Sequence, residues 1–327
     1  MKKLLSIIAA LLLTLPLWAQ EGSSSYNVLK LPASSHAAAL GGDNISNIED
    51  TPAAGWSNPA LLATVTDKSV GLDFMTYNSG SLYTGAQFVK AFGERHTAAA
   101  MVQLLSYGSM DETDERGAVL GTFNPKDMVV GLGYSYLLSA RMAGGATLKM
   151  TSQNYAGYTS FAMSVDLGLD YFDAETDLSV SATMKNVGAQ LKSFHADQRA
   201  HLPFVMQLGV TKGLEHIPVR LNLTLTDLTR WKSSYYYLPA DEESMGFGRK
   251  LLNHIIVGVD VLPTEYLYLA AGYNVRRAYE LKSAGSSKLA GLTFGGGLQL
   301  KKFKFGISYA KYHVGNASFM ANIAYSI

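Results

Sequence analysis

Apolar and polar side chains alternate along most of the chain from residue 68 to its end. Successive side chains of a strand point to opposite faces, so this period predicts strands with one apolar face. In the last stretch, that face would carry Ala317, Phe319, Ala321, Ile323, Tyr325 and Ile327. Fourteen such segments are centred near residues 72, 87, 102, 133, 147, 166, 181, 208, 222, 257, 270, 295, 308 and 322. The pattern predicts an all-β protein.

The connections between these segments sort into two kinds. Tight turns such as GERH and DAE alternate with connections that include two long loops, residues 108–126 and 230–253. Short turns on one rim and long loops on the other are typical of outer-membrane barrels. A soluble sandwich or propeller would also alternate, but globular chains usually contain about 25% charged residues, whereas this chain contains 16%. We therefore predict a 14-stranded antiparallel outer-membrane β-barrel over residues 68–327.

Two segments precede the predicted barrel. Residues 1–19 combine Lys2 and Lys3 with an apolar run and the small residue Ala19, which predicts a signal peptide cleaved near Ala19 and export to the outer membrane. Residues 20–67 lack sustained alternation and contain several prolines. So short a segment buries too little surface to fold alone, so we predict that it forms a plug in the barrel lumen.

Composition excludes several classes of function. The net charge is +1 and there is no cysteine, which argues against a nucleic-acid-binding protein and against thiol chemistry. The seven histidines are scattered, and no GxSxG elbow or HExxH motif occurs. His195 and His201 share a loop with Asp197, where a solvated loop is favoured over a weak metal site. We predict no catalytic residue, no bound metal and no cofactor.

Aromatic residues gather in the longest loop. Trp231 is followed by Tyr235, Tyr236 and Tyr237, and successive side chains of an extended chain cannot all face lipid. Tyrosine and tryptophan are frequent anchors of protein interfaces, so these four residues are candidates for partner binding. The alternative is that they belong to the aromatic girdle of the barrel or pack within the loop.

The segment before the first strand carries the most specific motifs. Residues 31–33 read LPA and run into ALGG at 39–42, and Asn58, Pro59 and Ala60 begin a second motif, NPALL. With the export signal and the run of alternating strands, this order resembles the FadL-like outer-membrane proteins. The resemblance covers the whole chain after residue 19. Within that family the chain is most similar to the PorV-related barrels of the type IX secretion system.

This resemblance implies a 14-stranded barrel whose N-terminal segment plugs the lumen. It also implies a non-enzymatic anchor that holds a PorZ-like surface protein, with PorV and PorU as further partners, in contact with outer-membrane lipid and lipopolysaccharide. The alternative is a FadL-like channel that passes a hydrophobic small molecule. A channel needs a pocket and a route out of the lumen, whereas an anchor needs only a filled barrel. A third hypothesis is a barrel enzyme such as a phospholipase.

Overall fold

The computed structural model describes residues 26–327, except 79, 196–198 and 239–243. The predicted signal peptide, residues 1–19, lies outside the described residues, as do the first residues of the predicted plug. Within the described ranges, no helix combines the length and the apolar character that crossing a membrane requires.

Fourteen strands close into one antiparallel barrel, as the alternation predicts. Neighbouring barrel strands in the chain pair with each other, and β1 pairs with β16 to close the ring, with Ser69 opposite Ser326. The barrel strands are β1 (Ser69–Thr76), β2 (Leu82–Phe92), β3 (His96–Ser106), β6 (Lys126–Ser139), β7 (Met142–Tyr155), β8 (Tyr158–Asp173), β9 (Leu178–Lys192), β10 (Val205–Gly213), β11 (Val219–Leu225), β12 (Ile255–Thr264), β13 (Leu267–Asn274), β14 (Leu292–Gln299), β15 (Phe303–Ala310) and β16 (Ser318–Ser326).

The two faces of the barrel wall have opposite character. On β11, Leu223 points outward and is 41% exposed, whereas its neighbour Thr224 points into the lumen and is 2% exposed. Most other strands repeat this pattern of apolar residues outside and small polar residues inside. On β1, β2, β3 and β6 the inner face also carries large apolar residues, which pack against Trp56 and Leu62 of the segment before β1; they include Met75, Tyr83, Met101 and Val129. Such a wall suits lipid outside and a polar filling inside, which is the arrangement of transmembrane barrels.

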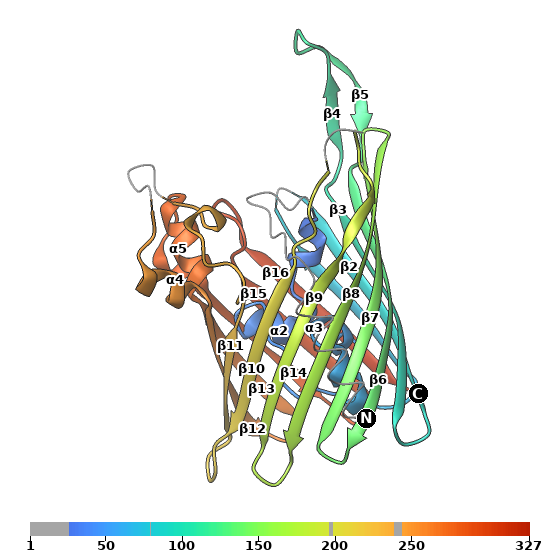
Figure 1. Cartoon of the computed structure of the whole chain (residues 1–327), viewed down its shortest axis with the longest axis vertical. Coiled ribbons are helices and arrows are strands. Elements are labelled where there is room, and N and C mark those ends of the chain that lie inside the picture. The colour runs from blue at the N-terminus through green and yellow to red at the C-terminus, as the bar shows by residue number, and fades with distance from the viewer. Residues whose placement is uncertain (1–25, 79, 196–198, 239–243) are drawn as a thin grey trace, which may run out of the picture.

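The connection at residues 108–126 differs from the expected loop. It forms a hairpin of β4 (Met110–Thr113) and β5 (Val119–Phe123), which stands above the rim of the barrel (Figure 1). Its turn is held by Asp114, whose side chain accepts hydrogen bonds from the backbone N–H groups of Arg116 and Ala118, both at 2.8 Å. Strands of four and five residues are too short for their alternation to stand out in a sequence.

The barrel wall is much taller on one side than on the other. Strands β6 to β9, here called the tall wall, have 14 to 16 residues. Strands β10 to β15, here called the short wall, have 7 to 10 residues. Helices cover the loop end of the short wall (Figure 1). They are η3 (Ser233–Tyr235), α4 (Phe247–Asn253), α5 (Val275–Ser283) and η4 (Lys288–Gly291).

The segment before β1 lies against the inner face of the wall. It contains η1 (Asn27–Lys30), α2 (Ser35–Ala39), α3 (Ala54–Ser57) and η2 (Pro59–Thr64), which Figure 1 shows among the barrel strands. We call residues 26–67 the inner segment. Helix η2 contacts β6, β7 and β8, and α2 contacts β13 to β16. At Gly145 an added Cβ would lie 2.4 Å from the carbonyl carbon of Pro59, so the wall needs glycine where η2 approaches it.

Candidate functional site

A cavity of about 350 Å³ lies between the inner segment and the loop end of the short wall. We call it the chamber. The inner segment lines it with residues 29–33, Gly42, Asp43 and Ser57, and the wall and the rim complete it with Lys185, Asn186, Pro203, Val205, Thr226, Asp227, Arg230, Ile256, Asn274, Arg276, Arg277, Glu280 and Tyr312. Five of these side chains are basic, Lys30 included, and three are acidic, so the chamber carries an excess of positive charge.

Helix α5 brings two arginines to the chamber. It begins directly after β13, because the Asn274 side chain accepts a hydrogen bond from the backbone N–H of Arg277 at 2.9 Å and so caps the helix. The same side chain donates to the carbonyl of Gly41 in the inner segment at 3.2 Å. Ala278 and Leu281 are buried beneath the helix. The cap therefore fixes Arg276 and Arg277 relative to both the wall and the inner segment.

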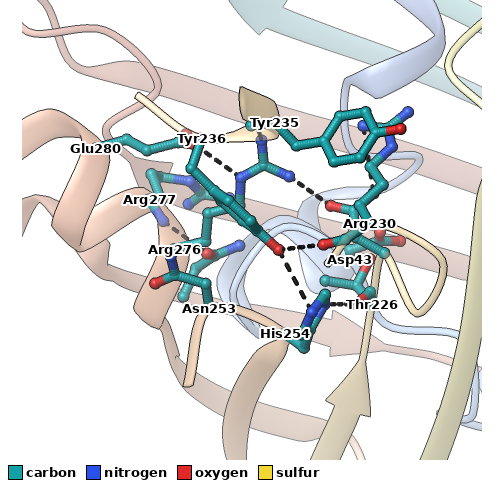
Figure 2. A network of polar contacts seen from close by, with 12 residues as sticks. Asp43, Thr226, Arg230, Tyr235, Tyr236, Asn253, His254, Arg276, Arg277 and Glu280 are labelled. Atoms are coloured by element: carbon teal, nitrogen blue, oxygen red, sulfur yellow. Dashed lines mark hydrogen bonds and ion pairs between the residues drawn. The ribbon is translucent and has the colours of Figure 1, made fainter. Parts of the chain in front are cut away.

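Arg276 is fully matched by acidic and carbonyl partners (Figure 2). Its guanidinium donates to Asp227 at 2.6 Å, to Glu280 at 2.8 Å and to the backbone carbonyl of Tyr235 at 3.0 Å. Burial alone would lower the pKa of Arg276, but Glu280 and Asp227 outweigh burial and raise it above its ordinary value. This arginine links Asp227, Glu280 and the backbone at Tyr235, and its charge is balanced by the two carboxylates.

Arg277 has a different environment. One of its terminal nitrogens, Nη2, donates to the carbonyl of Gly41 at 2.7 Å, and the guanidinium lies 4.4 Å from the centre of the Tyr312 ring. The other terminal nitrogen, Nη1, is buried and lacks a hydrogen-bond partner, as does the Tyr312 hydroxyl. No ion pair joins Arg277 to a carboxylate in the part of the chain that the structure describes. Burial accordingly lowers the pKa of Arg277.

A second cluster links the inner segment to the short wall below the chamber. The His36 ring lies 2.7 Å from Asp260 of β12 and 3.3 Å from Glu49, and it stacks on Tyr268 with ring centres 3.9 Å apart. Burial would lower the pKa of His36, but the two carboxylates outweigh burial and raise it to about 10. Asn222 also donates to Asp260 at 2.9 Å. We call His36, Glu49 and Asp260 the latch.

The structure separates the four aromatic residues that the sequence singles out. Tyr236 is buried over the chamber rim and donates to the carbonyl of Arg230 at 2.7 Å, and Arg276 stacks on its ring (Figure 2). Tyr235 lies beside it, with Arg230 5.9 Å from its ring centre. Tyr237 is exposed. Trp231 is also exposed and stacks on Phe247 of α4. The four residues do not form one surface, and partner binding by them stays a prediction.

The motif at Asn58, Pro59 and Ala60 attaches η2 to the tall wall. The Asn58 side chain accepts a hydrogen bond from the Ala60 N–H at 3.0 Å and caps η2. It also donates to the carbonyl of Ile45 at 3.0 Å and to the carbonyl of Leu169 at 3.4 Å. Its role in this structure is to position the inner segment.

Sequence reasoning missed the residues that line the chamber and form the latch. Arg276 and Arg277 carried a usable signal, because two adjacent arginines directly after a strand are unusual in a charge-poor chain. His36 and Asp260 carried none, because they are 224 positions apart and each resembles any other polar lumen residue.

Comparison with known proteins supports the fold. The chain matches no protein-family model and no curated protein sequence. The toluene transporter TodX of Pseudomonas putida is similar in structure, with a TM-score of 0.58 and 13% identity over 90% of this chain and 98% of that one. The monoaromatic hydrocarbon channel CymD (TM-score 0.55, 12% identity) covers 92% of this chain and 98% of its own. A Pseudomonas aeruginosa FadL homologue (0.51, 11%) covers 90% and 98%. The barrel architecture is therefore that of FadL-family outer-membrane proteins.

Proposed function

We propose that this protein is an outer-membrane channel that admits small amphipathic molecules through the chamber. The observation that carries the proposal is the chamber itself, a cavity of about 350 Å³ between the inner segment and the loop end of the barrel. A likeness to TodX, CymD and a FadL homologue along nearly the whole chain agrees with a channel. This choice reverses the order of the two functions that the sequence resemblance implies.

The lining of the chamber defines the chemistry of the molecule it would accept. Leu31, Pro32, Val205 and Ile256 supply apolar surface, whereas Arg277 supplies a guanidinium that no carboxylate pairs with among the described residues. A buried donor gains most from an ionised acceptor, because a charge-assisted hydrogen bond is stronger than a neutral one. The best fit is a molecule with an apolar body and one carboxylate or similar anionic end.

Passage beyond the chamber requires part of the inner segment to move. Gly42 and Asp43, just after α2, form part of the chamber lining. Asp43 accepts a hydrogen bond from Gln207 of the short wall and lies 3.9 Å from Lys185. These polar contacts exchange readily with water or a ligand. Both α2 and η2 also pack on the wall through backbone carbonyls and close glycine contacts, at Gly272 and Gly145 respectively, but the contacts of η2 with the tall wall involve no charged side chain. We propose that the part of the inner segment around α2 moves away from the short wall, whereas the part around η2 stays on the tall wall.

A binding experiment tests the ligand class. Decanoate and decanol share an apolar chain and differ in charge, so each is titrated as a radiolabelled probe against the protein in lipid nanodiscs, with empty nanodiscs subtracted. We expect tighter binding of decanoate, and the substitution Arg277→Met should weaken it about tenfold or more, since one charge-assisted hydrogen bond is worth about 1.5–3 kcal/mol.

The control variant is Arg249→Met. Arg249 stacks on Tyr279 at 3.9 Å and does not line the chamber, so its loss should leave both affinities unchanged. Equal decanoate affinity in wild type and Arg277→Met would refute the assignment of the anionic end to Arg277. Absence of saturable binding by either probe would refute the channel proposal.

The second candidate function is the surface anchor implied by the resemblance to PorQ of the type IX secretion system. The β4–β5 hairpin favours it, since the hairpin exposes Met110, Val119 and Leu120 beyond the rim and lines no part of the chamber. An anchor should retain a PorZ-like protein in pull-downs from solubilised outer membranes. Replacing residues 109–124 by a short turn should then release that partner while the barrel still folds.

A further inference from the structure

The strands of the short wall do not by themselves span the apolar layer of a membrane. Strand β11 has 7 residues and β13, β14 and β15 have 8 each. At about 3.4 Å per residue and a tilt of about 40°, such strands rise roughly 18–21 Å, whereas the apolar band of an outer-membrane barrel is about 25 Å tall. Strand β8 of the tall wall has 16 residues and by the same geometry rises roughly 40 Å. Something else must complete the apolar band on the short side.

Helix α4 presents large apolar side chains at the loop end of this wall. Phe247 is 72% exposed, Leu252 is 46% exposed and Leu251 is similarly open. Trp231 stacks on Phe247, with ring centres 5.9 Å apart and planes at 15°. We call these four residues the rim cluster. Figure 1 shows α4 beyond the upper ends of the short-wall strands, away from the tall wall.

The rim cluster continues the outer face of β12. Val257, Val259 and Val261 point outward and are exposed, and Leu252 precedes the first residue of β12 by three positions. The backbone N–H of Thr226 donates to the carbonyl of His254 at 2.8 Å, which extends the contact between the two chain segments up to the end of α4. On the other side of α4, Asn253 is buried, and His254, directly after the helix, is buried beneath Trp231 with ring centres 4.3 Å apart. The helix therefore has one buried side and one apolar exposed side.

We propose that the rim cluster is embedded among lipid acyl chains and completes the apolar band of the short wall. Burial of apolar surface in lipid is favourable relative to exposure to water, and the gain grows with the apolar area removed from water, so four large apolar side chains favour this location. Arg249 and Lys250 on the same helix suit the adjoining headgroup level, where long basic side chains extend to water and phosphate. This inference needs only the barrel and does not depend on ligand binding in the chamber.

Tryptophan fluorescence tests the proposal directly. The chain contains Trp18, Trp56 and Trp231, so a chain that starts at residue 20 and carries Trp56→Phe reports on Trp231 alone. This variant is refolded into phosphatidylcholine vesicles whose acyl chains are brominated at a shallow or a deep position. We expect the emission to fall at least twofold with shallow bromines, less with deep ones, and to resist iodide in the water.

The matched control carries Trp231→Phe and reports on Trp56, which lies inside the barrel at 5% exposure. Neither brominated lipid nor iodide should quench it. If Trp56→Phe prevents folding, the difference between wild type and Trp231→Phe gives the same signal. Quenching of Trp231 by iodide together with no effect of brominated lipid would overturn the proposal, and would leave the rim cluster as a water-facing surface for a protein partner.

Discussion

The tall wall and the short wall hold the inner segment by different chemistry. On the tall wall the contacts of α3 and η2 are neutral: Ser135 donates to the carbonyl of Ala60 at 3.0 Å, and Thr147 donates to the carbonyl of Gly55 at 3.4 Å. An ionic contact with this wall, 3.9 Å between Asp43 and Lys185 of β9, lies at the chamber. On the short wall several contacts are ionic, including the latch and the pair between Lys304 and Asp50.

This difference determines which contacts of the inner segment can respond to pH or to a charged ligand. A neutral hydrogen bond contributes about 0.5–1.5 kcal/mol and does not respond to pH or to a charged ligand. A buried ionic contact depends on protonation and on competing ions. The chamber borders the short wall, where Arg277 also lies. The short wall therefore has the contacts that a ligand could exchange, and the tall wall has those that keep the segment in place.

The largest expected effect comes from breaking the latch. The substitution His36→Leu leaves Asp260 and Glu49 without their shared cation, and an uncompensated buried charge costs about 3–5 kcal/mol. The urea midpoint for unfolding in lipid vesicles should fall accordingly. His195→Leu, at an exposed loop position, is the control and should change nothing. Similar midpoints for both variants would show that the latch does not stabilise the barrel.

Alkaline pH should release the same contact. The pKa of His36 is about 10 in the folded protein and about 6.5 when unfolded, so its stabilising effect is complete below pH 6.5 and declines as pH rises toward 10. Hydrogen exchange of residues 35–47 should accelerate over that interval after correction for intrinsic rates. Residues 58–64, held by the tall wall, should not follow. Parallel acceleration of both halves would remove the distinction between the two walls.

A charge on the lipid face tests the outer surface of the short wall. The substitution Leu223→Arg should cost about 2–4 kcal/mol near the membrane midplane. Leu120→Arg places the same charge on the exposed β5 hairpin and should be neutral. The folded, heat-modifiable band on gels gives both results. Equal yields of folded protein would contradict the assignment of Leu223 to lipid.

A smaller loss is expected at the tall wall. The substitution Asn58→Ala removes the cap of η2 and the donor to the Ile45 carbonyl, which together should cost about 1–2 kcal/mol. The urea midpoint measures it, and Asn78→Ala serves for comparison, since the half-buried Asn78 accepts a hydrogen bond from Asn316 at 3.2 Å but does not contact the inner segment through it. A loss as large as that of His36→Leu would mean that neutral and ionic contacts matter equally.

The sequence predicts the barrel well, because lipid and a polar lumen impose opposite demands on alternate residues such as Leu223 and Thr224. It does not predict the structure of the segments outside the barrel strands. The four-residue strand β4 is too short to show a period, and the partners of His36 come from distant parts of the chain. Even the motif at Asn58 indicates a specific local structure without revealing its partner Leu169. Contacts of the inner segment depend on the folded barrel, and no local pattern encodes them.

The most direct test of the channel ties the inner segment by a disulfide to the short wall in one variant and to the tall wall in another. The chain has no cysteine, so paired substitutions introduce one disulfide at a time. Ser46→Cys with Thr211→Cys joins the inner segment to the short wall, where the two hydroxyls lie 2.9 Å apart. Asn58→Cys with Gly168→Cys joins it to the tall wall, where a Cβ at Gly168 would lie 3.1 Å from the Asn58 side-chain carbonyl carbon.

Decanoate entry into proteoliposomes is then measured for both oxidised variants, before and after reduction. The account predicts that the short-wall disulfide stops entry and that reduction restores it, whereas the tall-wall disulfide leaves entry unchanged. Unimpaired entry with the short-wall disulfide closed would contradict a route that begins at the chamber and passes α2.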